Sequence, residues 1–95
     1  MDLLSGTNTS SLFVSSAQQQ QQLEYIASNT LKNGIDLYQK KDYEGAARAF
    51  KGALSMAPSS SFSKDAAKYL AMAQLNLGET DKAIDAYKTS IKLHP

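Results

Sequence analysis

Few residues of this 95-residue chain have the types and spacing that catalysis requires. Asp81 and Asp85 are four residues apart, which on a helix places two carboxylates on one face, and paired carboxylates serve general acid–base catalysis. Lysines such as Lys82 alternate with them, however, and this pattern is typical of solvated helix surface. The only histidine, His94, precedes Pro95 at an expected helix end, where a cation complements the helix dipole. We therefore predict that the chain is not an enzyme.

Metal and cofactor sites also lack support in the composition. The chain has no cysteine and one histidine, so it lacks both a thiolate nucleophile and the usual set of zinc ligands. Its five glycines are too scattered to form a loop that cradles phosphate. We expect no catalytic residue, no metal and no cofactor.

Charge and hydropathy exclude two further classes of partner. Ten basic residues against nine acidic ones give a net charge of +1, too little to attract nucleic acid or an anionic membrane. No apolar run approaches the roughly 18 residues of a membrane-spanning helix. Because no Lys or Arg precedes Lys32, the basic region of a secretory signal is missing. We expect a cytoplasmic protein that binds neither nucleic acid nor membrane.

The elements that would position a binding surface are helices. Periodic apolar residues and helix-stop signals predict helices over residues 17–40, 43–56, 61–77 and 80–93, and no strand pattern occurs. Asp42 is expected to cap the second helix, Pro58 to follow its end, and Gly78 to end the third. The Ser- and Thr-rich residues 1–16 are expected to form a flexible tail. Its apolar Leu12, Phe13 and Val14 are either untethered or docked on a groove of this chain or of a second copy.

The sequence repeats itself after 37 residues. Positions of the same size class coincide at this shift, and they are Gly34 with Ala71, Ala46 with Ala83, Phe50 with Tyr87, Ala53 with Ser90, and Pro58 with Pro95. Small residues at Gly34 and Ala46 allow two helices to approach closely, and Phe50, one turn beyond Ala46, fills the space beside them. Each half therefore predicts one pair of closely packed helices.

This pattern resembles the tetratricopeptide repeat (TPR), a 34-residue helix–turn–helix unit. The signature positions that match are Gly34, Tyr43, Ala46, Phe50, Ala53 and Pro58 in the first repeat, and Leu70, Ala71, Gly78, Ala83, Tyr87 and Pro95 in the second. The resemblance implies an all-α fold, an α-solenoid of two antiparallel helix–turn–helix repeats with an N-terminally extended first helix. The first repeat would cover residues 17–60 and the second residues 61–95.

The sequence departs from the family pattern at several positions. Residues 61–63 are an insertion, which we expect to add a turn to the third helix. Thr30 and Ala67 replace the large aromatic residues that the family often has, and Gln74 stands where an apolar residue is usual. These changes weaken the expected packing and leave the resemblance intact.

The resemblance also implies a concave face lined by the first helix of each repeat. On the first helix a second apolar stripe lies about 90° from the packing face, more than one core requires. Together with the matching positions of the third helix it would form an apolar groove of Leu31, Ile35, Tyr38, Tyr69, Met72 and Leu75. The groove lacks the Lys, Asn and Arg clamp with which some TPR domains hold acidic chaperone tails.

Three functions follow from these observations. The first is a non-catalytic module, part of a larger scaffold or co-chaperone-like protein, whose groove binds a peptide or helix of another protein. The second is a homo-oligomerisation module, at its simplest a homodimer, that stacks repeats between chains. The third is an RNA-binding helical repeat, against which the apolar groove argues.

The fourth helix is expected to leave an apolar flank uncovered, because no polar capping helix follows Pro95. A longer protein, a dimer or a docked N-terminal tail would each cover this flank. We expect the first of these.

Overall fold

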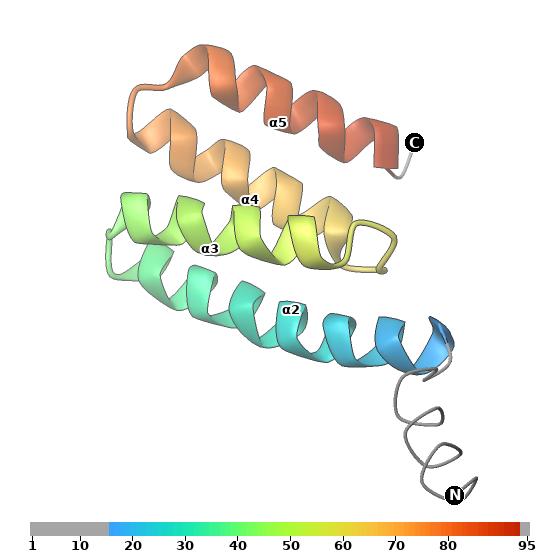
Figure 1. Ribbon diagram of the computed structural model, residues 1–95. Coiled ribbons are helices and arrows are strands. Elements are labelled where there is room, and N and C mark those ends of the chain that lie inside the picture. Colours follow the sequence, from blue (N-terminus) through green and yellow to red (C-terminus); the bar gives the residue numbers. More distant parts are fainter. Residues whose placement is uncertain (1–15, 94–95) are drawn as a thin grey trace, which may run out of the picture.

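The computed structural model of the chain describes residues 16–93, which form four helices and no strand. They are α2 (Ser16–Gln39), α3 (Tyr43–Met56), α4 (Ser63–Asn76) and α5 (Thr80–Leu93). The helices stack in chain order, each antiparallel to the one before it (Figure 1). The sequence-based expectation of an all-α arrangement of two helical hairpins is confirmed.

Both hairpins turn through the same backbone motif. At the end of α2 the amide of Lys41 donates to the carbonyl of Tyr38, and the amide of Asp42 donates to that of Leu37. At the end of α4, Gly78 and Glu79 donate to Leu75 and Gln74 in the same pattern. This Schellman motif requires a left-handed residue, and the φ angles of Lys41 and Gly78 are +68° and +79°. These two positions are also separated by the 37-residue repeat.

Asp42 caps the N-terminus of α3, as the sequence predicted. Its Oδ1 accepts a hydrogen bond of 3.0 Å from the amide of Gly45, one of the amides that a helix start leaves without a partner.

The connection between the two hairpins differs from the expectation. Residues 61–63 were expected to add a turn to the third helix, and this is wrong because α4 begins only at Ser63. The hydroxyl of Ser60 donates to the carbonyl of Ala57, and the hydroxyl of Ser63 donates to that of Ser60, at 2.7 and 2.9 Å. Serine side chains that bond to nearby backbone favour turns over helix. Since both serines are buried, these bonds let polar residues occupy the interior of the loop.

The core is built from alanines around one aromatic ring. Nine fully buried alanines line the helix contacts, and Phe50 is the largest of the fully buried side chains. A Cβ placed on Gly34 would lie 2.6 Å from Cε1 of Phe50, so the close approach of α2 and α3 depends on glycine there. The ring of Phe50 also stacks on that of Tyr69 in α4, with centroids 5.4 Å apart. Phe50 thus joins the first hairpin to the second.

One core position carries a polar side chain. Gln74 is buried, and its Oε1 has no hydrogen-bond partner among the described residues. It is one of the departures from the family pattern noted in the sequence. An unpaired buried acceptor is destabilising, since it loses its bonds to water and gains none.

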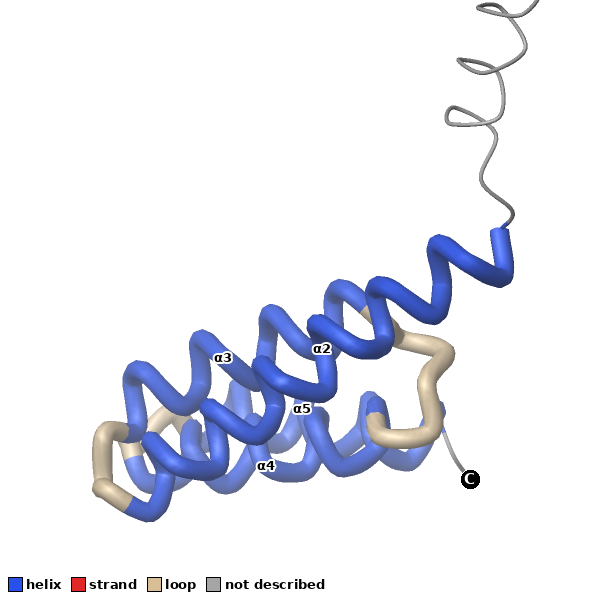
Figure 2. Tube along the Cα trace, turned by 90° about the horizontal axis from the view of Figure 1, so that it is seen from below, coloured by secondary structure: helices blue, strands red, loops and turns tan. Residues whose placement is uncertain are grey.

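The N-terminal part of α2 extends beyond α3 (Figure 2). Helix α2 has 24 residues and α3 has 14, and the first core residue of α2 is Ala27. The extended first helix expected from the sequence is therefore present. No described helix is long and apolar enough to cross a membrane.

Candidate protein-binding surface

The first helices of the two hairpins, α2 and α4, contact each other directly. A hydrogen bond connects them, in which Nδ2 of Asn76 donates to the hydroxyl oxygen of Tyr38 at 3.0 Å. Asn76 also donates to the carbonyl of Met72, which holds its amide close to α4. The Tyr38 ring stands edge-on to Tyr43 of α3, with centroids 5.2 Å apart. Tyr38 is therefore fixed from two sides, at the place where α2, α3 and α4 meet.

The six residues predicted to line a groove differ in exposure. Leu31 is buried, at 9% exposed, and belongs to the core cluster. Leu75 is 47% exposed. The remaining four are half-buried, namely Ile35, Tyr38, Tyr69 and Met72. Ile35, Tyr38 and Tyr69 rest on the core with one side.

The contact between the two hairpins explains why the six residues differ in exposure. Tyr69 turns one ring face to Phe50, so only its remaining surface is available to a ligand. Among the large apolar residues of α4, Leu70 is buried, Met72 is half-buried and Leu75 is exposed. The accessible apolar surface is therefore concentrated toward Ile35, Tyr38, Met72 and Leu75. Sequence periodicity placed these residues on one face, but it could not predict the Asn76–Tyr38 hydrogen bond that connects the two helices.

The arrangement offers hydrophobic contact and one hydrogen-bonding group, not reactive chemistry. Within residues 16–93, no three His, Asp or Glu side chains are grouped to hold a metal ion. Asp81 and Asp85 are both exposed on α5, which contributes none of the six groove residues. His94 lies outside the described residues.

A family model of the tetratricopeptide repeat matches residues 37–95. The chain belongs to this family. No curated protein and no solved structure matches it. TPR repeats are generally protein–protein interaction modules and are typically non-catalytic. The match includes α3, α4, α5 and the last residues of α2, so it reaches both of the TPR hairpins described above.

The residues predicted to pack the TPR units are placed in three ways. The glycine, the alanines and the ring of Phe50 are buried. These residues are Gly34, Ala46, Phe50, Ala53, Ala71 and Ala83. Pro58 is exposed in the loop that follows α3. Tyr87, the counterpart of Phe50, is 37% exposed, and Pro95 lies outside the described residues. Leu12, Phe13 and Val14, considered as a docking tail, lie outside them too.

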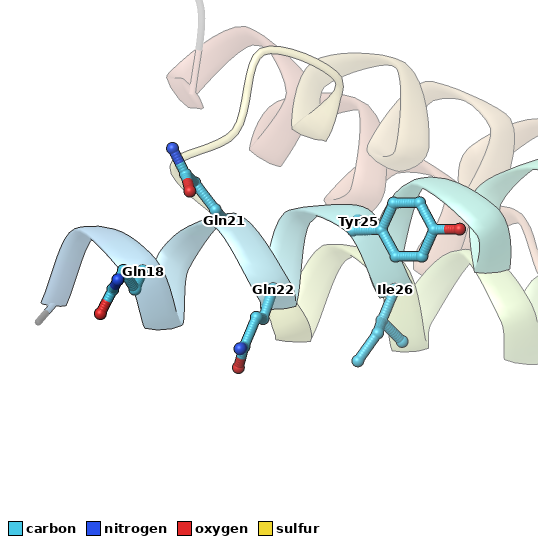
Figure 3. A pocket seen from close by; sticks show the side chains of 5 residues that line it. All are labelled: Gln18, Gln21, Gln22, Tyr25 and Ile26. Carbon is cyan, nitrogen blue, oxygen red and sulfur yellow. The ribbon is translucent and has the colours of Figure 1, made fainter. Parts of the chain in front are cut away.

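The extended part of α2 presents apolar residues that the sequence did not single out. A shallow hollow there is lined by Gln18, Gln21, Gln22, Tyr25 and Ile26, all on this one helix (Figure 3). Tyr25 and Ile26 are among the exposed large apolar residues of the protein. They extend the uncovered apolar surface of α2 beyond the TPR core.

Proposed function

We propose that this TPR protein binds an apolar or amphipathic segment of another protein on the face formed by α2 and α4, as part of a scaffold or co-chaperone-like protein. The observation that carries the proposal is the partly exposed apolar set Ile35, Tyr38, Met72 and Leu75 around the Asn76–Tyr38 hydrogen bond. Tyrosine is well suited to such a surface, because its ring supplies apolar area while its hydroxyl remains available for hydrogen bonding.

The side chains of this face indicate the chemistry of the ligand. Neither Asp, Glu, Lys nor Arg occurs among the six residues proposed for the groove. A ligand held mainly by charge would find no counter-ion among them, whereas leucine, methionine or aromatic side chains would displace water from apolar surface. We therefore expect a ligand with two or three apolar anchors spaced one helical turn apart, or at alternate positions of an extended peptide.

Selection from a peptide-display library tests this proposal. Wild-type protein is the bait, and affinities of selected peptides are then measured by fluorescence anisotropy. Leu75→Glu places a charge where we expect an apolar anchor, so its affinity should fall at least 10-fold. Because Leu75 is already 47% exposed, this change is expected to leave the fold intact. Ile35→Glu and Met72→Glu test the half-buried part of the face in the same assay.

Ile91→Glu is the matched control, since Ile91 is an exposed aliphatic residue on α5 and not part of the proposed groove. Its affinity for the selected peptides should equal that of wild type. Unchanged binding by Leu75→Glu and Met72→Glu, both folded by circular dichroism, would contradict the proposal.

A further inference from the structure

The outer face of α5 carries an uncovered apolar stripe. Ile84, Tyr87 and Ile91 are 46%, 37% and 65% exposed. With about 100° between successive residues, the three lie within about 60° of one another on the helix. The buried residues Ala86 and Ser90 lie on a different side of α5, whereas Ala83, one turn before Tyr87, lies at the edge of the stripe. The stripe is therefore a second apolar face of α5 that adjoins its contact with α4 on the Tyr87 side.

The internal repeat shows what such a stripe does elsewhere in the same chain. The residues 37 positions earlier on α3 are Ala47, Phe50 and Leu54, and they are buried or packed against the core. Helix α4 covers this face of α3, and Phe50 stacks on Tyr69 there. The equivalent face of α5 has no covering helix among residues 16–93. The α5 stripe therefore has the kind of side chains that pack against a helix on α3, but no described helix packs against it.

We propose that a second copy of the chain covers this stripe, with the two α5 helices packed antiparallel across a twofold axis. Charge is the observation that selects this occupant. Asp81 and Asp85 lie in the first half of α5, and Lys88 and Lys92 in the second half, and all four are exposed. Asp81, Lys88 and Lys92 lie beside the stripe, whereas Asp85 also lines a hollow with Leu70 and Gln74 of α4. Neither of the two ion pairs between described residues uses any of these four.

An antiparallel pair brings the acidic half of each helix beside the basic half of the other. With Ile84 opposite the second copy's Tyr87, each Lys88 is level with the turn between Asp81 and Asp85 of the other chain. A twofold axis perpendicular to both helices places the charged flanks on the same side of the pair, so both sets of contacts form together. A parallel pair would place Lys88 beside Lys88 and Asp85 beside Asp85, which is repulsive.

The opposite end of the molecule argues against stacking the copies head to tail. In that arrangement α2 of the next copy would cover α5 as α4 covers α3. Position by position, however, the counterparts of Ala66, Tyr69, Leu70 and Ala73 of α4 are Asn29, Lys32, Asn33 and Asp36 of α2, all exposed. Burying this polar face against Ile84 and Ile91 would desolvate two charged side chains against apolar ones, which is costly. A symmetric contact between α5 helices avoids that cost.

Sedimentation velocity of the intact chain from 1 µM to 1 mM tests the proposal. An interface one helix wide is small, so we expect a monomer–dimer equilibrium with a dissociation constant of about 10 µM to 1 mM. Ile91→Glu should stay monomeric over the whole range. Ile26→Glu, which changes an exposed isoleucine on α2, should associate as wild type does. Circular dichroism melts verify that each variant is folded.

Charge exchange distinguishes the antiparallel pairing from nonspecific association. Lys88→Glu should weaken association at least 10-fold, because Glu would face Asp81 and Asp85 of the other chain. The double variant Asp81→Lys, Asp85→Lys should weaken it similarly, since three lysines would then cluster. An equimolar mixture of the two variants restores every opposite-charge contact and should dimerise as strongly as wild type.

Three results would each overturn the proposal. They are a wild-type chain that stays monomeric at 1 mM, a folded Ile91→Glu variant that still dimerises, and a mixture of charge variants that associates no better than its components. The first would mean that a helix from another protein or another segment covers α5. Because no step uses the groove of α2 and α4, a failure here leaves the proposed peptide-binding function standing.

Discussion

Gly34 is the position at which the first hairpin tolerates least change. A Cβ added there would lie 2.6 and 2.8 Å from two ring atoms of Phe50 and 3.1 Å from Cβ of Ala49. Phe50 cannot move away easily, because it is fully buried and its ring stacks on Tyr69. The contact therefore sets the distance between α2 and α3.

We predict that Gly34→Ala lowers the free energy of unfolding by about 1–3 kcal/mol, the usual cost of overpacking a core. Alanine favours helix by about 1 kcal/mol over glycine, so the loss is what remains after this gain. Urea unfolding followed by circular dichroism at 222 nm measures it.

Gly52→Ala is the matched control for that measurement. A Cβ at Gly52 meets only Cγ2 of Thr30, at 3.8 Å, which is an ordinary van der Waals contact. The same substitution should here raise the free energy of unfolding by about 0.5–1 kcal/mol. Equal effects of the two substitutions would show that the Phe50 contact does not limit the approach of the helices.

The sequence predicted some residue contacts and missed others for a physical reason. The close approach at Gly34 beside Phe50 followed from side-chain size and helical period within one hairpin. The Asn76–Tyr38 hydrogen bond joins two hairpins, so it depends on their relative placement, which no local pattern encodes. The unpaired Oε1 of buried Gln74 likewise depends on packing between helices.

The two repeats also differ at the residue that ends the first helix of each hairpin. Lys41 and Gly78 occupy the same left-handed position of the same capping motif, one per hairpin. Glycine adopts this conformation without steric cost, whereas a residue with a Cβ is strained in it. The first hairpin is therefore closed by a less suitable residue than the second.

Lys41→Gly is expected to raise the free energy of unfolding by about 1 kcal/mol, and Gly78→Ala to lower it by a similar amount. Thermal and urea unfolding of the two variants measure these opposite effects. Lys40→Gly controls for loss of a lysine side chain, since the φ of Lys40 is not positive. It should destabilise the protein slightly or not at all, because its ion pair with Asp36 is exposed. A gain from Lys40→Gly equal to that from Lys41→Gly would contradict the conformational explanation.

Helix boundaries were predictable wherever a capping residue determines them. Asp42 and Gly78 act through their own side chain or lack of one, so their effect can be predicted from sequence. The start of α4 was not predictable in this way. Ser60 and Ser63 each bond to a carbonyl three residues earlier, and this turn competes successfully with an extra turn of helix.

Over the whole molecule, stability depends on contacts between successive helices. Each helix packs mainly on its neighbours in the chain, with one further contact between α2 and α4. Repeat proteins of this kind gain stability from nearest-neighbour interfaces, so an element with two neighbours opens less often than one with a single neighbour. Both proposed binding surfaces lie beside this core, one across α2 and α4 and the other on the outer face of α5.

Hydrogen exchange should follow this order. We predict the slowest amide exchange in α3 and α4, which are covered on two sides, faster exchange in α5, and the fastest before Ala27, where α2 extends beyond α3. Mass spectrometry of peptide fragments at 1 µM protein measures the monomer. Repeating it near 1 mM should slow exchange in α5 selectively if α5 pairs with α5, and Ile91→Glu should abolish that change. Protection of α5 equal to that of α3 at 1 µM would contradict the nearest-neighbour explanation, because α5 would then owe its stability to something other than α4.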